Sequence, residues 1–284
     1  MAVARHDTGP LSAGRALASQ VHPVFMLPPL ATSLFGGLLA GGLSLPTAVL
    51  HAGAMFFAVY TAHVKDGYVD FHVRGEDDDH PMTETGCRLA LAGATAGFVA
   101  CTAGIALAVG PWAALLTAPT WLIGYAHAPQ LDLNTVGATM GYPTGIALAL
   151  VGGYYVQATS FSPRVLGLAA VFLVLLTGIK IIDDEKDYDY DRSIQKRTVA
   201  VVLGPRRARR LALGLLATAL VGVVALTVTL PGMPPSGAGA ALVFGAVALV
   251  AQRAESSLAT KLLIRGSYLF LAVLVAAVWF RPLG

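Results

Sequence analysis

The stretch VLGLAAVFLVLLTGIKIIDDEKDYDYD, residues 165–191, joins an apolar segment to a dense group of acidic residues. A bilayer core of about 30 Å needs about 20 apolar residues per helix, so the first part of this stretch predicts a membrane-spanning helix. Similar segments recur along the chain, which is 56% hydrophobic and only 12% charged. Soluble domains average about 45–50% apolar and about 25% charged residues. The sequence therefore predicts an all-α integral membrane protein.

Glycine, proline and charged residues divide the chain into apolar segments and predict nine transmembrane helices. The expected ranges are 22–42, 46–64, 86–108, 111–127, 136–156, 163–183, 211–230, 237–252 and 260–280. The two long connections, 65–85 and 183–210, come four helices apart. This spacing indicates one polytopic domain over residues 1–284, with two related halves at roughly 22–156 and 163–280.

The distribution of charge predicts the orientation. A cytosolic N-terminus puts 17 of the 19 Lys and Arg residues on the cytosolic side and leaves only Arg164 and Arg281 outside, as the positive-inside rule requires. All 16 acidic residues fall on the same side, which is expected to be the working face of a multi-pass protein of the cell membrane. The first 20 residues lack the apolar core of a signal peptide, so no cleaved leader is expected.

The cysteines and the net charge argue against structural disulfides, a cysteine-based metal cluster and nucleic-acid binding. Cys87 and Cys101 are expected on one helix, and 14 residues of helical rise would separate them by about 21 Å. They therefore cannot form a disulfide with each other, and a cysteine-based metal cluster is not expected. A net charge of +3 is weak support for nucleic-acid binding, so no nucleic-acid partner is predicted.

Asp184, Asp187 and Asp191 stand at i, i+3 and i+7. If the preceding helix continues through them, all three point to one face. Stacked like charges are destabilising unless something neutralises them, and Mg²⁺ is the usual partner of hard carboxylate oxygens. Because Mg²⁺ completes its shell with water and substrate phosphate, this cluster predicts a phosphorylated ligand as well as a metal.

A second acidic group follows the helix at 46–64. Asp66 and Asp70, at i and i+4, share a face, and residues 76–79 add four further acidic side chains, which are either part of the site or solvated in a loop. Two facing acidic helix ends could hold metal ions around a diphosphate. The predicted catalytic and metal-binding residues are Asp66, Asp70, Asp184, Asp187 and Asp191.

A diphosphate also needs cations from the protein. Lys180 lies one turn before Asp184, and Lys196 and Arg197 follow Asp191, so all three are predicted phosphate contacts. The alternative is that they only set the orientation and reach the interface. The Arg-rich run at 206–210 is interpreted as lipid headgroup contacts.

At these residues the chain resembles the UbiA superfamily of intramembrane prenyltransferases. The resemblance rests on the Asp-x-x-Asp-x-x-x-Asp spacing, the segment Gln195-Lys196-Arg197-Thr198 and the segment Val201-Val-Leu-Gly204. The resemblance implies nine helices around a central lateral, lipid-accessible cavity and two Asp-rich motifs that bind Mg²⁺ and a prenyl diphosphate.

The first motif departs from the family pattern Asn-Asp-x-x-Asp-x-x-x-Asp. Aligning Asp70 puts Asp66 at the Asn, Gly67 at the first Asp and Arg74 at the last. Either residues 76–79 replace the missing carboxylates, or Arg74 contacts phosphate directly. In the loop after the fourth helix, His127, Asp132 and Asn134 are expected either to orient an acceptor or to be solvated.

The resemblance implies Mg²⁺-dependent transfer of a polyprenyl group, for example geranylgeranyl, from its diphosphate. The expected acceptor is lipophilic, a quinone precursor or an isoprenoid glycerol lipid. The alternatives are a membrane transporter and a protein that binds prenyl lipids without turnover. Transport would place ionisable residues at mid-membrane depth, and the middles of the predicted spans contain essentially none.

Overall fold

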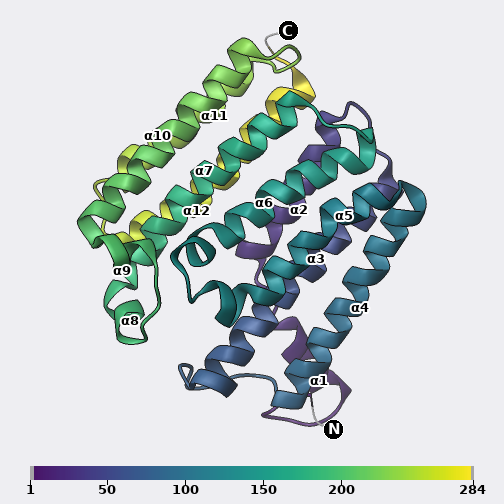
Figure 1. Cartoon of the computed structure of the whole chain (residues 1–284), viewed down its shortest axis with the longest axis vertical. Helices are drawn as coiled ribbons and strands as arrows, with labels where there is room; N and C mark the ends of the chain where they lie inside the picture. Colours follow the sequence, from purple (N-terminus) through teal and green to yellow (C-terminus); the bar gives the residue numbers. More distant parts are fainter. Residues whose placement is uncertain (1–2, 283–284) are drawn as a thin grey trace.

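The computed structural model describes residues 3–282, whose regular secondary structure is helical apart from an isolated bridge between Ala4 and Met82. Nine of these helices, 13 to 25 residues long, correspond to the nine expected segments (Figure 1). They are α2 (Pro23–Leu39), α3 (Leu45–Gly67), α4 (Glu84–Ala108), α5 (Pro111–Ala126), α6 (Thr135–Ala158), α7 (Pro163–Lys186), α10 (Pro205–Thr229), α11 (Gly239–Ala251) and α12 (Ser256–Phe280).

Short helical segments fill the connections between the long helices. The π-helical turns η1 (Tyr68–Arg74) and η2 (His127–Leu131) continue α3 and α5. The remaining short elements are α1 (Pro10–Ala18), α8 (Tyr188–Ser193), α9 (Val199–Leu203) and η3 (Pro235–Ala238).

Five helices are long and apolar enough to cross a membrane: α3 with η1, α4, α7, α10 and α12. The bent pair α1 and α2, with 69° between them, makes a sixth if it is counted as one span. Large apolar side chains also face outward, for example Leu107, Val228 and Leu242. An all-helical fold with apolar helices is therefore confirmed, whereas nine spans and a cytosolic N-terminus stay predictions.

The long helices pack as one continuous bundle. α2 packs on α6, α3 on α4 and α5, α7 on α10, and α11 on α12. The contact between α6 and α7, supported by α12 on α2, joins the earlier helices to the later ones. The main apolar core lies on the later side, around Phe172, Leu175, Phe244 and Phe270.

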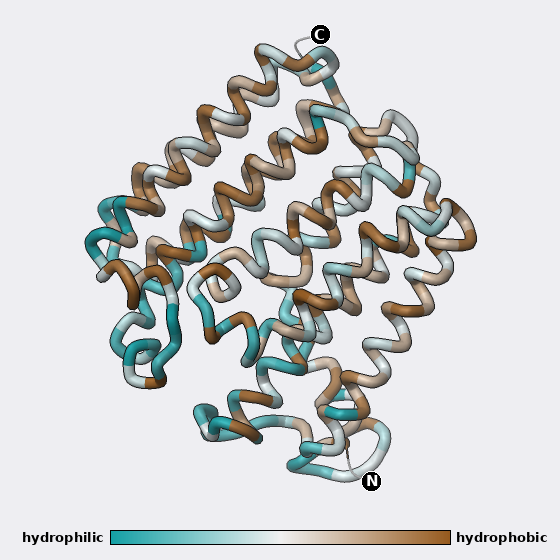
Figure 2. The backbone as a smooth tube through the Cα atoms, viewed as in Figure 1, coloured by the Kyte–Doolittle hydropathy of each residue, from teal (hydrophilic) through white to brown (hydrophobic). Residues whose placement is uncertain are grey.

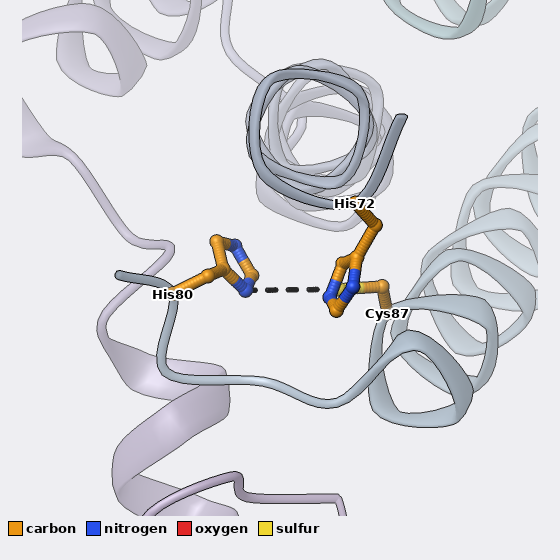
Figure 3. Close-up of side chains that lie close together, drawn as sticks. All are labelled: His72, His80 and Cys87. Atoms are coloured by element: carbon orange, nitrogen blue, oxygen red, sulfur yellow. Dashed lines mark hydrogen bonds between the residues drawn. The ribbon is translucent and has the colours of Figure 1, made fainter. Parts of the chain in front are cut away.

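Polar residues gather at one end of this bundle, near η1, α8 and α1 (Figure 2). There η1, the loop that follows it and the start of α4 pack together around His72, His80 and Cys87 (Figure 3). Both cysteines are free, as expected.

The structure corrects one assumption about the second acidic cluster. α7 ends at Lys186, and Asp187 has φ −100° and ψ 12° before α8 starts at Tyr188. The carbonyl end of a helix carries partial negative charge and disfavours the acidic residues that accumulate there. The stripe at i, i+3 and i+7 is therefore split between two helices.

α2 and α6 approach so closely that only glycine fits at their contact. A Cβ atom at Gly153 would lie 2.0 Å from the Ser33 carbonyl oxygen, and one at Gly36 would lie 2.2 Å from the Leu150 carbonyl oxygen. Small residues of this kind allow membrane helices to pack backbone to backbone.

We expect Gly153→Ala to lower the free energy of unfolding by about 1–3 kcal/mol, because the added methyl group meets backbone and cannot be accommodated without a helix shift. Gly145→Ala, in the same helix with no heavy atom within 4 Å of its added Cβ, is the control and should not destabilise. Thermal unfolding midpoints in detergent compare the two, and equal midpoints would contradict the packing described.

Candidate functional site

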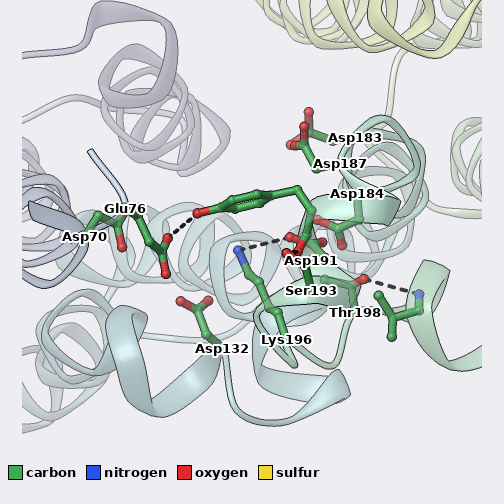
Figure 4. Close-up of polar contacts among 12 residues, drawn as sticks. Asp70, Glu76, Asp132, Asp183, Asp184, Asp187, Asp191, Ser193, Lys196 and Thr198 are labelled. Carbon is green, nitrogen blue, oxygen red and sulfur yellow. Dashed lines mark hydrogen bonds and ion pairs between the residues drawn. The ribbon is translucent and has the colours of Figure 1, made fainter. Parts of the chain in front are cut away.

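Acidic segments that are more than 100 residues apart in the chain meet at the polar end of the bundle. Figure 4 shows Asp70 and Glu76 on one side and Asp184 and Asp191 on the other, with Asp132 and Lys196 between them. Asp70 lies on η1, which continues α3, and Glu76 lies in the loop after η1. Asp184 lies on α7 and Asp191 on α8. The two predicted clusters therefore face one another.

Asp184 and Asp191 form the buried part of the second segment, each only 3% exposed. Lys180 makes an ion pair with Asp184 and lies 3.8 Å from Asp183. The Lys196 ammonium is 4.0 Å from the Asp191 carboxylate. One oxygen of Asp184, Oδ2, is buried and has no hydrogen-bond partner among residues 3–282.

Burial raises the pKa of the Asp191 carboxyl, against the opposing effect of Lys196, and the nearby Asp184 raises it further. Two carboxylates that are buried close together repel each other unless enough positive charge lies beside them. The electrostatics of the second segment therefore favour a cation in addition to its two lysines.

Asp187 is more peripheral than the sequence predicted. Its side chain is 51% exposed, and its carboxylate lies 3.7 Å from the Lys186 ammonium. The break between α7 and α8 explains this position, because a continuous helix would have placed Asp187 in line with Asp184 and Asp191.

Arg74 organises the first segment. Its guanidinium lies 3.4 Å from Asp70, 3.7 Å from Glu76 and 3.6 Å from Asp132. Asp66, one turn before Asp70, interacts electrostatically with Asp132 and Arg74, and also with Lys196 of the second segment. Arg74 thus joins carboxylates of its own segment, Asp70 and Glu76, to Asp132 from the loop after η2.

A side-chain hydrogen bond links the two segments directly. The Tyr190 hydroxyl of α8 donates to Glu76 Oε2 at 2.7 Å. This bond, more than burial, raises the pKa of Tyr190 to about 12, so the hydroxyl stays protonated and donates throughout the neutral range.

A profile described as the UbiA prenyltransferase family matches residues 9–274. The chain belongs to this family. No sequence among the curated proteins matches it.

Solved structures of UbiA homologues share the fold. An apo homologue from Aeropyrum pernix K1 superposes with a TM-score of 0.70 at 18% identity and covers 90% of this chain and 98% of its own. A homologue from Archaeoglobus fulgidus, bound to GPP and Mg²⁺, superposes with a TM-score of 0.69 at 17% identity and covers 94% of this chain and 99% of its own. A digeranylgeranylglyceryl phosphate synthase superposes with a TM-score of 0.75 at 12% identity and covers 94% of this chain and 98% of its own.

The packing explains one departure of this chain from the UbiA motif. A Cβ atom at Gly67, where the family has its first Asp, would lie only 2.7 Å from His80 Nε2. The His80 ring therefore occupies the space that a motif carboxylate would need.

The four acidic residues 76–79 lie in different surroundings. Glu76 joins the cluster, whereas Asp79 lies 3.2 Å from Arg5 and 2.8 Å from His6 at the N-terminal segment. Asp77 and Asp78 are exposed, as expected of solvated loop residues.

Asp132 belongs to the cluster, and the interpretation of it as a solvated loop residue is wrong. It is 6% exposed and lies beside Arg74. Asn134 instead caps α6, because its Oδ1 accepts a hydrogen bond from the Gly137 amide at 2.7 Å. The only sequence signal for Asp132 was an acidic residue between Leu131 and Leu133.

The predicted phosphate contacts are positioned differently. Lys180 and Lys196 point at the acidic cluster, where a diphosphate would bring further negative charge. The Arg197 side chain is exposed and pairs with no acidic group in the part of the chain that the structure describes.

We expect Tyr190→Phe and Glu76→Ala to be coupled in a double-mutant cycle by about 0.5–1.5 kcal/mol, because either change removes the same hydrogen bond. Tyr188→Phe, two residues away and with no hydrogen bond from its hydroxyl among residues 3–282, is the control. Unfolding midpoints of the single and double variants measure the coupling. Additive effects would show that the bond does not connect the two segments in solution.

Proposed function

We propose that this UbiA family member transfers a polyprenyl group, such as geranylgeranyl, from its diphosphate to a lipophilic acceptor in a reaction that depends on Mg²⁺. The observation that carries the proposal is the convergence of Asp66, Asp70, Asp184 and Asp191 on one space that also holds Lys196. Two acidic segments with a shortage of positive charge fit a ligand made of metal ions and phosphate.

The donor groups fit Mg²⁺. The acidic cluster presents carboxylate oxygens, which Mg²⁺ prefers, and the buried Asp184 Oδ2 has no hydrogen-bond partner within the residues that the structure describes. Bound there, Mg²⁺ would neutralise negative charge on the diphosphate and so stabilise it as a leaving group. The proposed ligands are Asp66, Asp70, Asp184, Asp187 and Asp191.

The basic residues would hold the diphosphate. Lys180 and Lys196 supply point charges beside the second segment, and the exposed Arg197 is free to form a bidentate contact. Arg74 bridges Asp70 and Asp132, so its proposed role combines phosphate contact with positioning of the first segment.

In the reaction the bond between the allylic carbon and the diphosphate oxygen breaks, and its electron pair leaves with the diphosphate. The acceptor forms a new bond to that carbon and loses a proton. The chain contributes by fixing the diphosphate at the polar bundle end and by excluding water from the allylic carbon.

The proposed substrates follow from the family and from the fold. Structures with this fold include the homologue bound to GPP and Mg²⁺ and the digeranylgeranylglyceryl phosphate synthase. A quinone precursor or an isoprenoid glycerol lipid would reach the site through a lateral cavity. The proposal places residues 1–284 in the cell membrane as one polytopic domain with nine spans and a cytosolic N-terminus.

Transport is the less favoured function. In α7 and α10 the charged residues lie near the helix ends: Lys180 to Lys186 end α7, and the basic residues 206–210 start α10. A cation pathway needs ionisable residues across the membrane interior.

We expect Asp70→Asn and Asp191→Asn each to lower Mg²⁺-dependent diphosphate release from geranylgeranyl diphosphate by about 100-fold or more, which corresponds to about 2.7 kcal/mol of transition-state stabilisation. The exposed Asp189→Asn is the matched control on α8 and should keep its activity. Purified protein in lipid, assayed across aromatic and glycerol-lipid acceptors, provides the measurement.

The outcomes separate the three functions. Release that depends on the metal and on both segments supports transfer and identifies the acceptor class. Donor binding that needs Mg²⁺ without turnover on any acceptor would favour a prenyl-lipid-binding protein. Absence of donor binding would refute the proposal.

A further inference from the structure

A second group of metal-binding side chains lies outside the carboxylate site. His72, His80 and Cys87 each present a ligand atom, and these atoms lie within 4.8 Å of one another (Figure 3). His72 is on η1, His80 is in the loop that follows, and Cys87 is in the first turns of α4. The sequence predicted no cysteine-based site because the only two cysteines are far apart on one helix.

The group is enclosed. Cys87 is fully buried and His80 is only 4% exposed, while His72 is half-buried and leaves a route from the surface. Cys87 Sγ lies 4.0 Å from His80 Nδ1. The other nitrogen of His80, Nε2, is buried and finds no hydrogen-bond partner in the described part of the chain.

Backbone atoms of Met82 complete the surroundings. Its amide donates to His80 Nδ1 at 3.2 Å, a hydrogen bond that a metal ion at this nitrogen would replace. The Met82 carbonyl oxygen lies 3.1 Å from His80 Nδ1 and 3.2 Å from His72 Nε2. In a tetrahedral zinc site, metal–ligand bonds of about 2.0–2.3 Å separate neighbouring ligand atoms by roughly 3.3–3.8 Å. The observed distances are within about 1 Å of this arrangement, which small side-chain rotations can close.

We propose that His72, His80 and Cys87 bind one Zn²⁺ ion, with the Met82 carbonyl oxygen or a water molecule as the fourth ligand. A thiolate and two imidazoles suit zinc, whereas the carboxylates of the other site suit Mg²⁺. The two sites therefore select different ions although they share η1, which presents Asp70 to one and His72 to the other.

The zinc ion would fix the segment that carries the first acidic group. The loop between η1 and α4 contains Glu76 and is held at its far end by the N-terminal segment, through Arg5 N to Pro81 O at 2.9 Å and Thr83 N to Val3 O at 3.0 Å. A bond from zinc to both sides of this loop would restrain it between these anchors. This role is structural and does not depend on prenyl transfer.

The test uses the full chain in detergent, stripped of metal and then exposed to Zn²⁺ with a large excess of Mg²⁺ to occupy the carboxylates. Zinc retained after gel filtration is counted by mass spectrometry. We expect one zinc per chain in the wild type and in Cys101→Ser, the matched control on α4. Cys87→Ser and His80→Gln should bind at least about tenfold more weakly.

Cobalt provides a readout that needs no variant. Co²⁺ bound by Cys87 should give a thiolate-to-cobalt charge-transfer band in the wild-type protein, and added Zn²⁺ should abolish it. Absence of that band, absence of retained zinc in the wild type, or equal zinc retention by Cys87→Ser would overturn the proposal. None of these results depends on diphosphate release, so the zinc site and the proposed function can fail separately.

Discussion

Repulsion between buried carboxylates is the constraint on which the polar end of this molecule depends. Six acidic side chains, Asp66, Asp70, Glu76, Asp132, Asp184 and Asp191, meet three cations, Arg74, Lys180 and Lys196, which leaves a formal charge of −3 if all are ionised. Partly buried like charges interact strongly because little water screens them. The bundle end is consequently most stable when it holds additional positive charge.

This constraint connects the fold to the chemistry. The close contact of α2 with α6 and the contact of α6 with α7 bring the two acidic segments to the same end of the bundle. Each segment alone would leave its carboxylates exposed to water and weakly coupled. Held together, they concentrate negative charge, so under the proposed function a diphosphate would bind there only together with metal ions.

The sequence predicted the helical class and the acidic segments well because both depend on local signals. Runs of about 20 apolar residues and carboxylates at fixed spacing are visible without any tertiary contact. Asp132 and Glu76 were not assigned because their place in the site arises from Arg74 and Tyr190, which are distant in the chain or on another element. Asp187 was placed too centrally because the acidic residues themselves end α7 one turn before the predicted stripe is complete.

Gly67 shows how these local and distant effects combine. Taken from the sequence alone, it is a missing ligand in the first UbiA motif. In the structure its lack of a side chain makes room for the His80 ring, which brings an imidazole towards Cys87. Gly67 supplies no carboxylate to the cluster, whereas Glu76 and Asp132 contribute negative charge beside Arg74 from flanking loops. The space beside Gly67 is filled by His80, one of the three proposed zinc ligands. The unusual first motif and the group formed by His72, His80 and Cys87 therefore depend on the same packing of His80 against Gly67.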